Sequence, residues 1–209
     1  MRRKNPASFI LFILFLLCGI GSLSQDKNRV GVSIGIDKVF SANARVLAGF
    51  SFERILHQQN GAEIGFYYRS TISDKLIIYS PMGPNAAISE QFFILEKFLS
   101  VPLIYNYRSK TVNISMGVSA DIFAGWKEEK YLSNPPSAFP APLQDYKFDH
   151  KILWGGVARV SKTFRINEHI HLEPVIYYNP IFTRYSLYSG FVSGTRQYLG
   201  ALVSTKFVF

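Results

Sequence analysis

The feature that most constrains this chain is a long alternation of apolar with small or polar residues. In the stretch 112–126, VNISMGVSADIFAGW, every second residue is apolar, from Val112 through Met116 to Trp126. Side chains of a β-strand point to opposite faces with a period of two, so this stretch predicts a strand with one apolar and one polar face. Strands of soluble proteins have about 5–6 residues. A strand this long, with one apolar and one polar face, is stable only in a fold that places the two faces in different environments.

The same alternation recurs along the rest of the chain, and no convincing helical period follows residue 28. The further predicted strands are 30–37, 46–53, 62–69, 91–107, 152–160, 170–178 and 199–209. Recurrent two-residue periodicity separated by turn residues indicates an all-β protein. Together with the opening stretch, the sequence predicts eight strands.

The connections between these strands differ in length according to their position. Those after the second, fourth and sixth strands are short, at 55–60, 108–110 and 166–168. Those after the third, fifth and seventh are long, at 71–90, 128–149 and 180–194, whereas 38–43 is intermediate. Short and long connections therefore gather at opposite ends of an up-and-down meander. This is typical of transmembrane barrels with short periplasmic turns and long outer loops, so we predict an eight-stranded antiparallel up-and-down transmembrane β-barrel.

In such a barrel the apolar face meets lipid and the polar face lines the interior. Eight polar residues fall on the predicted inner face: Glu53, Glu63, Arg69, Glu96, Asn113, Asp121, Arg159 and Glu173. A hairpin centred near Ile166 would place Arg159 opposite Glu173, which predicts an ion pair between them. A soluble lipocalin-like barrel would reverse the two faces, with an apolar interior.

Aromatic residues cluster near the predicted strand ends, as in the girdles at the two membrane interfaces. The periplasmic set is Tyr105, Tyr107, Phe207 and Phe209, and the outer set is Tyr68, Trp126, Trp154 and Tyr178. Pro102 and Pro174 oppose regular pairing because proline has no N–H to donate. Each is expected at a bulge or beside an unpaired carbonyl.

The first residues have the composition of an export signal. A basic start, MRRK, precedes the apolar run FILFILFLLCGI, and small residues lead to a cut before Gln25. We therefore predict a signal peptide over 1–24, a barrel domain over 25–209 and location in the outer membrane. Cleavage would remove three cations and no acid, lowering the formal charge from +9 to +6. Cys18 would leave with it, although a lipid anchor on Cys18 is an alternative.

The segment 98–107, FLSVPLIYNY, resembles a motif of the PorT-like outer-membrane β-barrel family of the Bacteroidetes type. That family often has Glu where Ser100 stands here. The strand NISMGVSADIFAGW and the aromatic final strand are also similar to the family. The resemblance implies a small integral barrel, a role in protein secretion, and Phe209 as a signal for the barrel-assembly machinery.

Three groups of residues are candidates for chemistry. Asp145, Asp149 and His150, with Ser193, resemble parts of a hydrolase, but no nucleophile signature accompanies them. His169 and His171 have the spacing of a strand-borne metal pair, yet no further ligand completes the set. The proline-rich loop 133–143 is either a docking segment or an irregular loop. We predict no catalytic residues, no cofactor and no metal.

The predicted function is that of a non-enzymatic component with a filled interior, since eight strands leave room for little more than side chains. It would be structural or associated with protein secretion, acting through its outer loops or its periplasmic end. Its expected partners are outer-membrane lipid, the assembly machinery and a secretion-system or surface protein. Nucleic acid is excluded because the basic residues are scattered. The alternatives are a rim enzyme acting on lipid and a soluble small-molecule binder.

Overall fold

The computed structural model describes residues 28–39, 44–57, 59–79, 88–134, 151–186 and 193–209, and every regular element in them is a β-strand. The eight long strands are β1 (Asn28–Val39), β2 (Arg45–His57), β3 (Asn60–Tyr79), β4 (Ile88–Arg108), β5 (Asn113–Asn134), β6 (Ile152–Ser161), β8 (Ile170–Pro180) and β11 (Gln197–Val208). The short ones are β7 (Phe164–Arg165), β9 (Tyr185–Ser186) and β10 (Ser193–Gly194).

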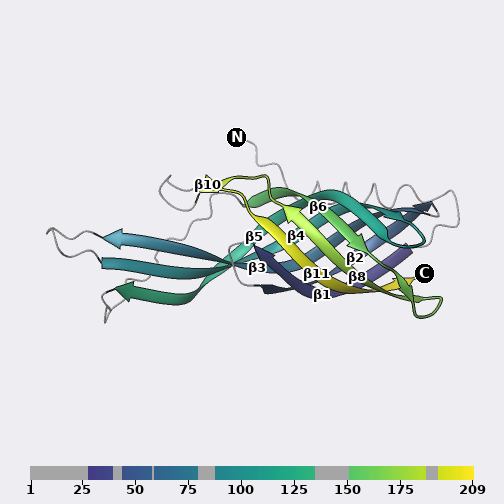
Figure 1. Cartoon of the computed structure of the whole chain (residues 1–209), viewed down its shortest axis with the longest axis horizontal. Helices are drawn as coiled ribbons and strands as arrows, with labels where there is room; N and C mark the ends of the chain where they lie inside the picture. The colour runs from purple at the N-terminus through teal and green to yellow at the C-terminus, as the bar shows by residue number, and fades with distance from the viewer. Residues whose placement is uncertain (1–27, 40–43, 58, 80–87, 135–150, 187–192) are drawn as a thin grey trace, which may run out of the picture.

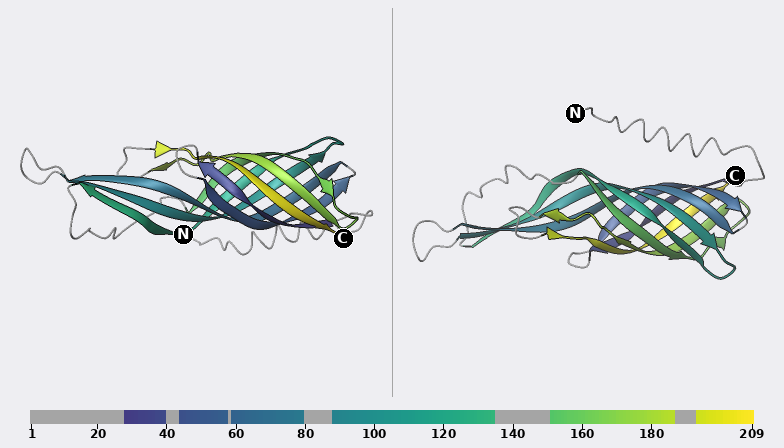
Figure 2. Two further views of the ribbon diagram at one scale, coloured as in Figure 1. Left: turned by 60° about the horizontal axis from the view of Figure 1, so that its bottom comes forward. Right: turned by 90° about the horizontal axis from the view of Figure 1, so that it is seen from above.

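The eight long strands form one closed antiparallel ring (Figures 1 and 2). Each strand pairs with its neighbour in the sequence, and β11 closes the ring by pairing with both β1 and β8. At the seam, Asn28 and Phe209 exchange two backbone hydrogen bonds of 3.0 Å. Closure leaves the ring without an unpaired edge, which is the condition for a sheet to exist in lipid. The predicted eight-stranded meander is confirmed.

The two faces of the ring have the predicted polarity. On β5, Met116 and Val118 are 65% and 54% exposed, whereas Ser119 is 2% exposed. The other strands repeat this pattern, so the outside carries an apolar belt while polar side chains point inward. This arrangement defines a transmembrane β-barrel of the outer-membrane type. Within the described residues there is no helix of the length and apolarity needed to span a bilayer.

Strands β3, β4 and β5 continue well beyond the ring and form an arm of three strands. The β3–β4 pairing runs on to Tyr79 and Ile88, and Ser89 of β4 pairs with Asn134 of β5. The arm projects from the end opposite the C-terminus (Figures 1 and 2). The prediction that 71–90 and 128–149 are wholly loop is therefore wrong. The apolar alternation stops near Ser73, but backbone pairing does not depend on it.

Both prolines interrupt the ladder where they fall. At Pro102 the β3–β4 pairing lapses between Ile64–Leu103 and Tyr67–Ser100, then resumes in the same register. At Pro174 the β6–β8 pairing ends at Ser161–Val175, and β7 continues the ladder three residues later at Phe164–Leu172. β6 therefore matches the predicted strand 152–160, and the missing N–H of Pro174 separates it from β7, which the sequence did not predict.

The register of the β6–β8 hairpin differs from the predicted one. Arg159 lies opposite Tyr177, not Glu173. The turn is centred two residues later than predicted, because the Asn167 side chain accepts hydrogen bonds from the backbone N–H groups of His169 (2.9 Å) and Ile170 (2.7 Å). When the centre of a hairpin moves by two residues, the residue opposite a given position changes by four, here from Glu173 to Tyr177. An even shift keeps Arg159 and Glu173 on the inner face but gives them other partners.

Seven of the eight predicted girdle aromatics lie on the outer surface, each at least 37% exposed: Tyr68, Tyr105, Tyr107, Trp154, Tyr178, Phe207 and Phe209. Trp126 is the exception. The β4–β5 register shifts between Lys97 and Phe98, where Gly125 has a φ of 144°. Beyond this bulge Trp126 pairs with the fully buried Glu96 and so shares its inner face. The prediction of Trp126 as an outer girdle residue is wrong, because one inserted residue reverses the faces.

The position of the belt can be tested with a charge. Val118 lies midway along the β5 segment of the ring, whereas Ile166, 63% exposed, lies in the periplasmic turn. Arg at the bilayer midplane costs about 2–4 kcal/mol and near the interface about 0–1 kcal/mol. We expect Val118→Arg to lower the free energy of unfolding in lipid vesicles by the larger amount and Ile166→Arg by the smaller. Equal losses would contradict the assigned belt.

Candidate functional site

The interior of the barrel is occupied by side chains. All eight residues predicted for the inner face lie there, with their side chains at least nine-tenths buried. Two cavities within the ring measure about 20 Å³ and about 10 Å³. A cavity of this size holds about one water molecule. Side chains therefore fill the interior as they fill the core of a soluble protein. The charged groups among them form two ionic clusters.

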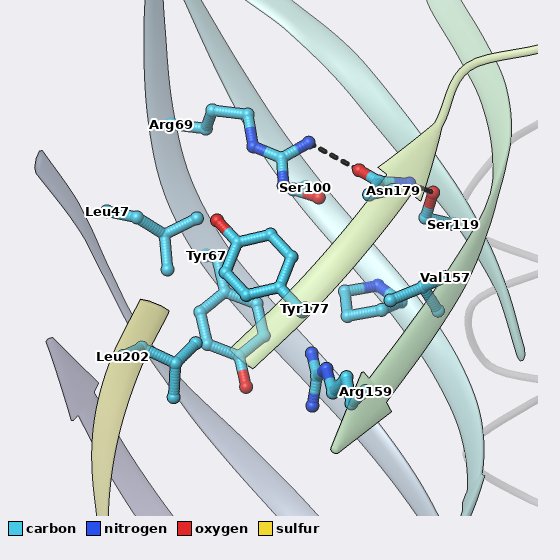
Figure 3. Close-up of a pocket in the computed structure, with 11 residues that line it drawn as sticks. Leu47, Tyr67, Arg69, Ser100, Ser119, Val157, Arg159, Tyr177, Asn179 and Leu202 are labelled. Atoms are coloured by element: carbon cyan, nitrogen blue, oxygen red, sulfur yellow. Dashed lines mark hydrogen bonds between the residues drawn. The ribbon is translucent and has the colours of Figure 1, made fainter. Parts of the chain in front are cut away.

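The cluster toward the outer end is centred on Arg69 of β3. Its guanidinium lies 2.7 Å from Asp37 of β1 and 2.9 Å from Asp121 of β5. It also donates a 2.6 Å hydrogen bond to Asn179 of β8, which in turn donates to Ser119 (Figure 3). One buried cation thus connects strands that are not neighbours in the ring.

The second cluster lies toward the end of the barrel with the short turns, which the sequence predicts to be the periplasmic end, and it is centred on Lys206 of β11. Its ammonium group lies 3.2 Å from Glu53, 2.9 Å from Glu63 and 2.8 Å from Glu173, on β2, β3 and β8. Asn106 donates hydrogen bonds to Glu53 (2.5 Å) and Glu63 (3.3 Å). Buried carboxylates need such partners because their hydration is lost.

Arg159 joins this second cluster through a partner that the sequence analysis did not assign to it. Its Nη1 lies 2.8 Å from Glu63, and its guanidinium carbon lies 5.6 Å from the centre of the Tyr67 ring. Glu173 pairs with Lys206 and accepts hydrogen bonds from Ser161 and Asn113. The predicted Arg159–Glu173 ion pair is therefore wrong, although both residues line the same interior.

An apolar layer separates the two clusters. It consists of Leu47, Tyr67, Val175, Tyr177 and Leu202, all buried. Figure 3 shows the rings of Tyr67 and Tyr177 between Arg69 on one side and Arg159 on the other. A second apolar group closes the outer end of the interior and consists of Phe98, Leu153, Ile181 and Tyr198, beside the ion pair of Arg196 with Glu96.

Several residues of these clusters were missed in the sequence. Lys206 alternates with the outward-facing residues Val203, Thr205 and Phe207. Its position in this two-residue period could have assigned it to the interior. Asp37 has the same signal in the first strand. Asn179 has no such signal in the sequence, because this residue lies just beyond the predicted strand 170–178. Phase identifies an inward side chain, but it does not identify the partner across the barrel.

The candidates for metal binding and for hydrolysis can be located only in part. The described residues contain no group of three or more His, Cys, Asp and Glu side chains suited to a metal. His171 is buried, but His169 is exposed in the turn that precedes β8. Asp145, Asp149, His150, Cys18, the 1–24 segment and residues 135–143 of the proline-rich loop lie outside the described residues. Ser193 begins β10.

The closed ring, its apolar exterior and its filled, charged interior define an integral outer-membrane β-barrel protein. The sequence matches no protein-family model and no curated protein.

Among solved structures the chain is similar to a major outer membrane protein from Thermus thermophilus (12% identity, TM-score 0.49, covering 89% of this chain and 100% of that one). It is also similar to OprG from Pseudomonas aeruginosa (10% identity, TM-score 0.48, covering 88% and 95%) and to outer membrane protein W of E. coli (12% identity, TM-score 0.45, covering 90% and 100%). At these levels the likenesses carry no inference about function.

The partner of Arg159 can be tested with double-mutant cycles. Residues in direct ionic contact show coupling energies of about 0.5–3 kcal/mol. We expect Arg159→Met and Glu63→Gln to couple within this range when unfolding is measured in detergent. The matched cycle of Arg159→Met with Glu173→Gln should give the smaller coupling energy. A larger coupling with Glu173 would restore the rejected register.

Proposed function

We propose that this chain is a non-conducting, non-enzymatic component of the outer membrane that acts through the two ends of its barrel. The observation that carries the proposal is the filled interior. Arg69 and Lys206 each hold three polar partners across the lumen, and the apolar layer lies between them. A solute would have to break buried ion pairs at two levels to pass. Each such break costs about 3–5 kcal/mol.

The end of the barrel that carries the arm supports a role in protein contact. Strands β3, β4 and β5 present a paired sheet well outside the ring, on the side of the long connections (Figure 1). Sheet extensions of this kind offer backbone groups at their edges to a partner strand. We place this partner in protein secretion, because the 98–107 segment resembles the PorT-like motif. In β4, Ser100 of this motif lines the interior beside Arg69 and Arg159.

The exposed aromatic end of β11 supports assembly by the barrel-assembly machinery. Phe209 is 67% exposed and follows directly on the strand that closes the ring. Phe209 is accordingly proposed as the assembly signal.

The filled interior predicts the electrical behaviour of the purified protein. In planar lipid bilayers we expect no long-lived conductance from the wild-type chain, since the interior cavities hold about one water molecule each. The double variant Tyr67→Ala, Tyr177→Ala, which removes the rings of the apolar layer, should raise the frequency of openings. Stable open steps in the wild type would overturn the non-conducting proposal.

The arm predicts a separable role outside the membrane. Residues 75–92 can be replaced by Asn-Gly, which favours a tight hairpin, so that Asp74 and Phe93 remain paired beneath it. We expect this variant to assemble at wild-type levels, judged by heat-modifiable gel migration. Protein secreted by its host should fall to the level of a strain that lacks the chain. Normal secretion by the deletion strain would contradict the secretion role. Full rescue by the shortened chain would contradict the role of the arm.

A further inference from the structure

The periplasmic mouth of the barrel carries more positive than negative charge. Glu53, Glu63 and Glu173 are matched there by Lys206, Arg159 and Arg108, each in direct ionic contact. Arg29 and Arg165 lie on the inner face at the same end and add two further cations. The nearest approach of Arg29 to Glu53 is 3.9 Å, which is a long ionic contact. The Glu53 carboxylate already pairs more closely with Arg108 and Lys206. Glu168, in the adjoining turn, forms no ion pair with Arg165 among the described residues.

The groups around this mouth converge from five strands, which are β1, β4, β7, β8 and β11. Arg165 of β7 lies directly opposite His171 of β8, and His171 lies opposite Lys206 of β11. Arg29 of β1 and Arg108 of β4 are both within electrostatic range of His171 and of each other. Cross-strand partners share a face of the sheet, so Arg165 is directed to the same mouth as the buried His171. The cluster therefore forms on one inner rim when the ring closes.

Several hydrogen-bond donors of this cluster are buried without a partner. Within the described part of the chain, the Nε and Nη1 atoms of Arg29 and the Nη1 atom of Arg108 have no hydrogen-bond acceptor. The ring of His171, which is 5% exposed, has no hydrogen-bond partner among the described residues at either nitrogen, so its N–H is a further donor without an acceptor. Buried donors without acceptors are rare and costly in folded proteins. An anion between them would supply acceptors and the missing negative charge together.

We propose that the periplasmic mouth binds a small oxyanion of the phosphate class, held by Arg29, Arg165 and His171 above the Lys206 cluster. Guanidinium groups present a planar fork of donors that matches the oxygen spacing of phosphate, which favours an oxyanion over chloride. Arg108 contributes its remaining N–H while keeping its ion pair with Glu53. This inference goes beyond the proposed function and does not depend on it.

The test is phosphate binding to the full barrel purified in a non-ionic detergent. Inorganic phosphate is titrated by calorimetry at constant ionic strength, with chloride as the exchanged anion. We expect saturable binding of one phosphate per chain with a dissociation constant in the range of about 1 mM or below. Arg29→Gln and Arg165→Gln should each weaken it about tenfold, the loss expected for one charge-assisted hydrogen bond.

Arg184→Gln is the matched control, since Arg184 is exposed beyond β8 at the other end of the barrel. It should change the affinity less than twofold. Arg165 is itself exposed at the rim, so its variant keeps the proposal testable if Arg29→Gln fails to fold. Absence of saturable binding up to about 10 mM phosphate would overturn the proposal. So would equal weakening by all three variants, which would indicate general attraction to a basic protein.

Discussion

The structure depends on one constraint, which is that a ring of eight strands removes water from every inward side chain. A charged group inside must then find its counter-charge across the lumen. Arg69 meets this requirement by contacting β1, β5 and β8, and Lys206 by contacting β2, β3 and β8. Except for the contact of Lys206 with β8, the ladder neighbour of β11, these contacts connect strands that the backbone ladder does not connect. The same desolvation that makes each charge costly therefore makes its position specific, because only the correctly closed ring brings each cation to its partners.

Volume imposes a second condition on the same interior. Tyr177 lies directly opposite Gly200, and a Cβ on that glycine would lie 2.4 Å from the tyrosine ring. Tyr67 lies directly opposite Gly49, where a Cβ would lie 2.7 Å from its ring, and a Cβ on Gly65, two residues earlier on the same strand, would lie 2.3 Å from it. Each large ring in the apolar layer thus takes the space that a neighbouring glycine leaves free. Close packing of this kind completes the separation of the two ionic clusters, and it explains why the interior behaves as a core and not as a channel.

The sequence predicted well which face of a strand each side chain occupies. It did not predict which side chain across the barrel each one contacts. Alternation with a period of two assigned all eight interior residues correctly, because lipid on one side and a crowded lumen on the other penalise any error of phase. The partner of Arg159 depended on where the hairpin turns, and that was decided by the short side chain of Asn167. Trp126 was misassigned for a related reason, since a bulge at Gly125 leaves no mark in the pattern of hydrophobicity. The arm was missed because backbone pairing outside the membrane needs no two-faced strand.

The middle of the barrel and its periplasmic mouth differ in how their cations are paired. In the middle, Arg69 holds two carboxylates and an amide, and the buried rings of the apolar layer pack beside it. At the periplasmic mouth, buried donors of Arg29, Arg108 and His171 remain without acceptors. These residues come from β1, β4 and β8, on either side of the seam where β11 closes the ring. They are brought together only in the closed barrel, so an anion that binds them binds the folded state alone. Such binding stabilises the closed barrel by mass action. The stability of the completed barrel would then rise with the concentration of the anion in the periplasm.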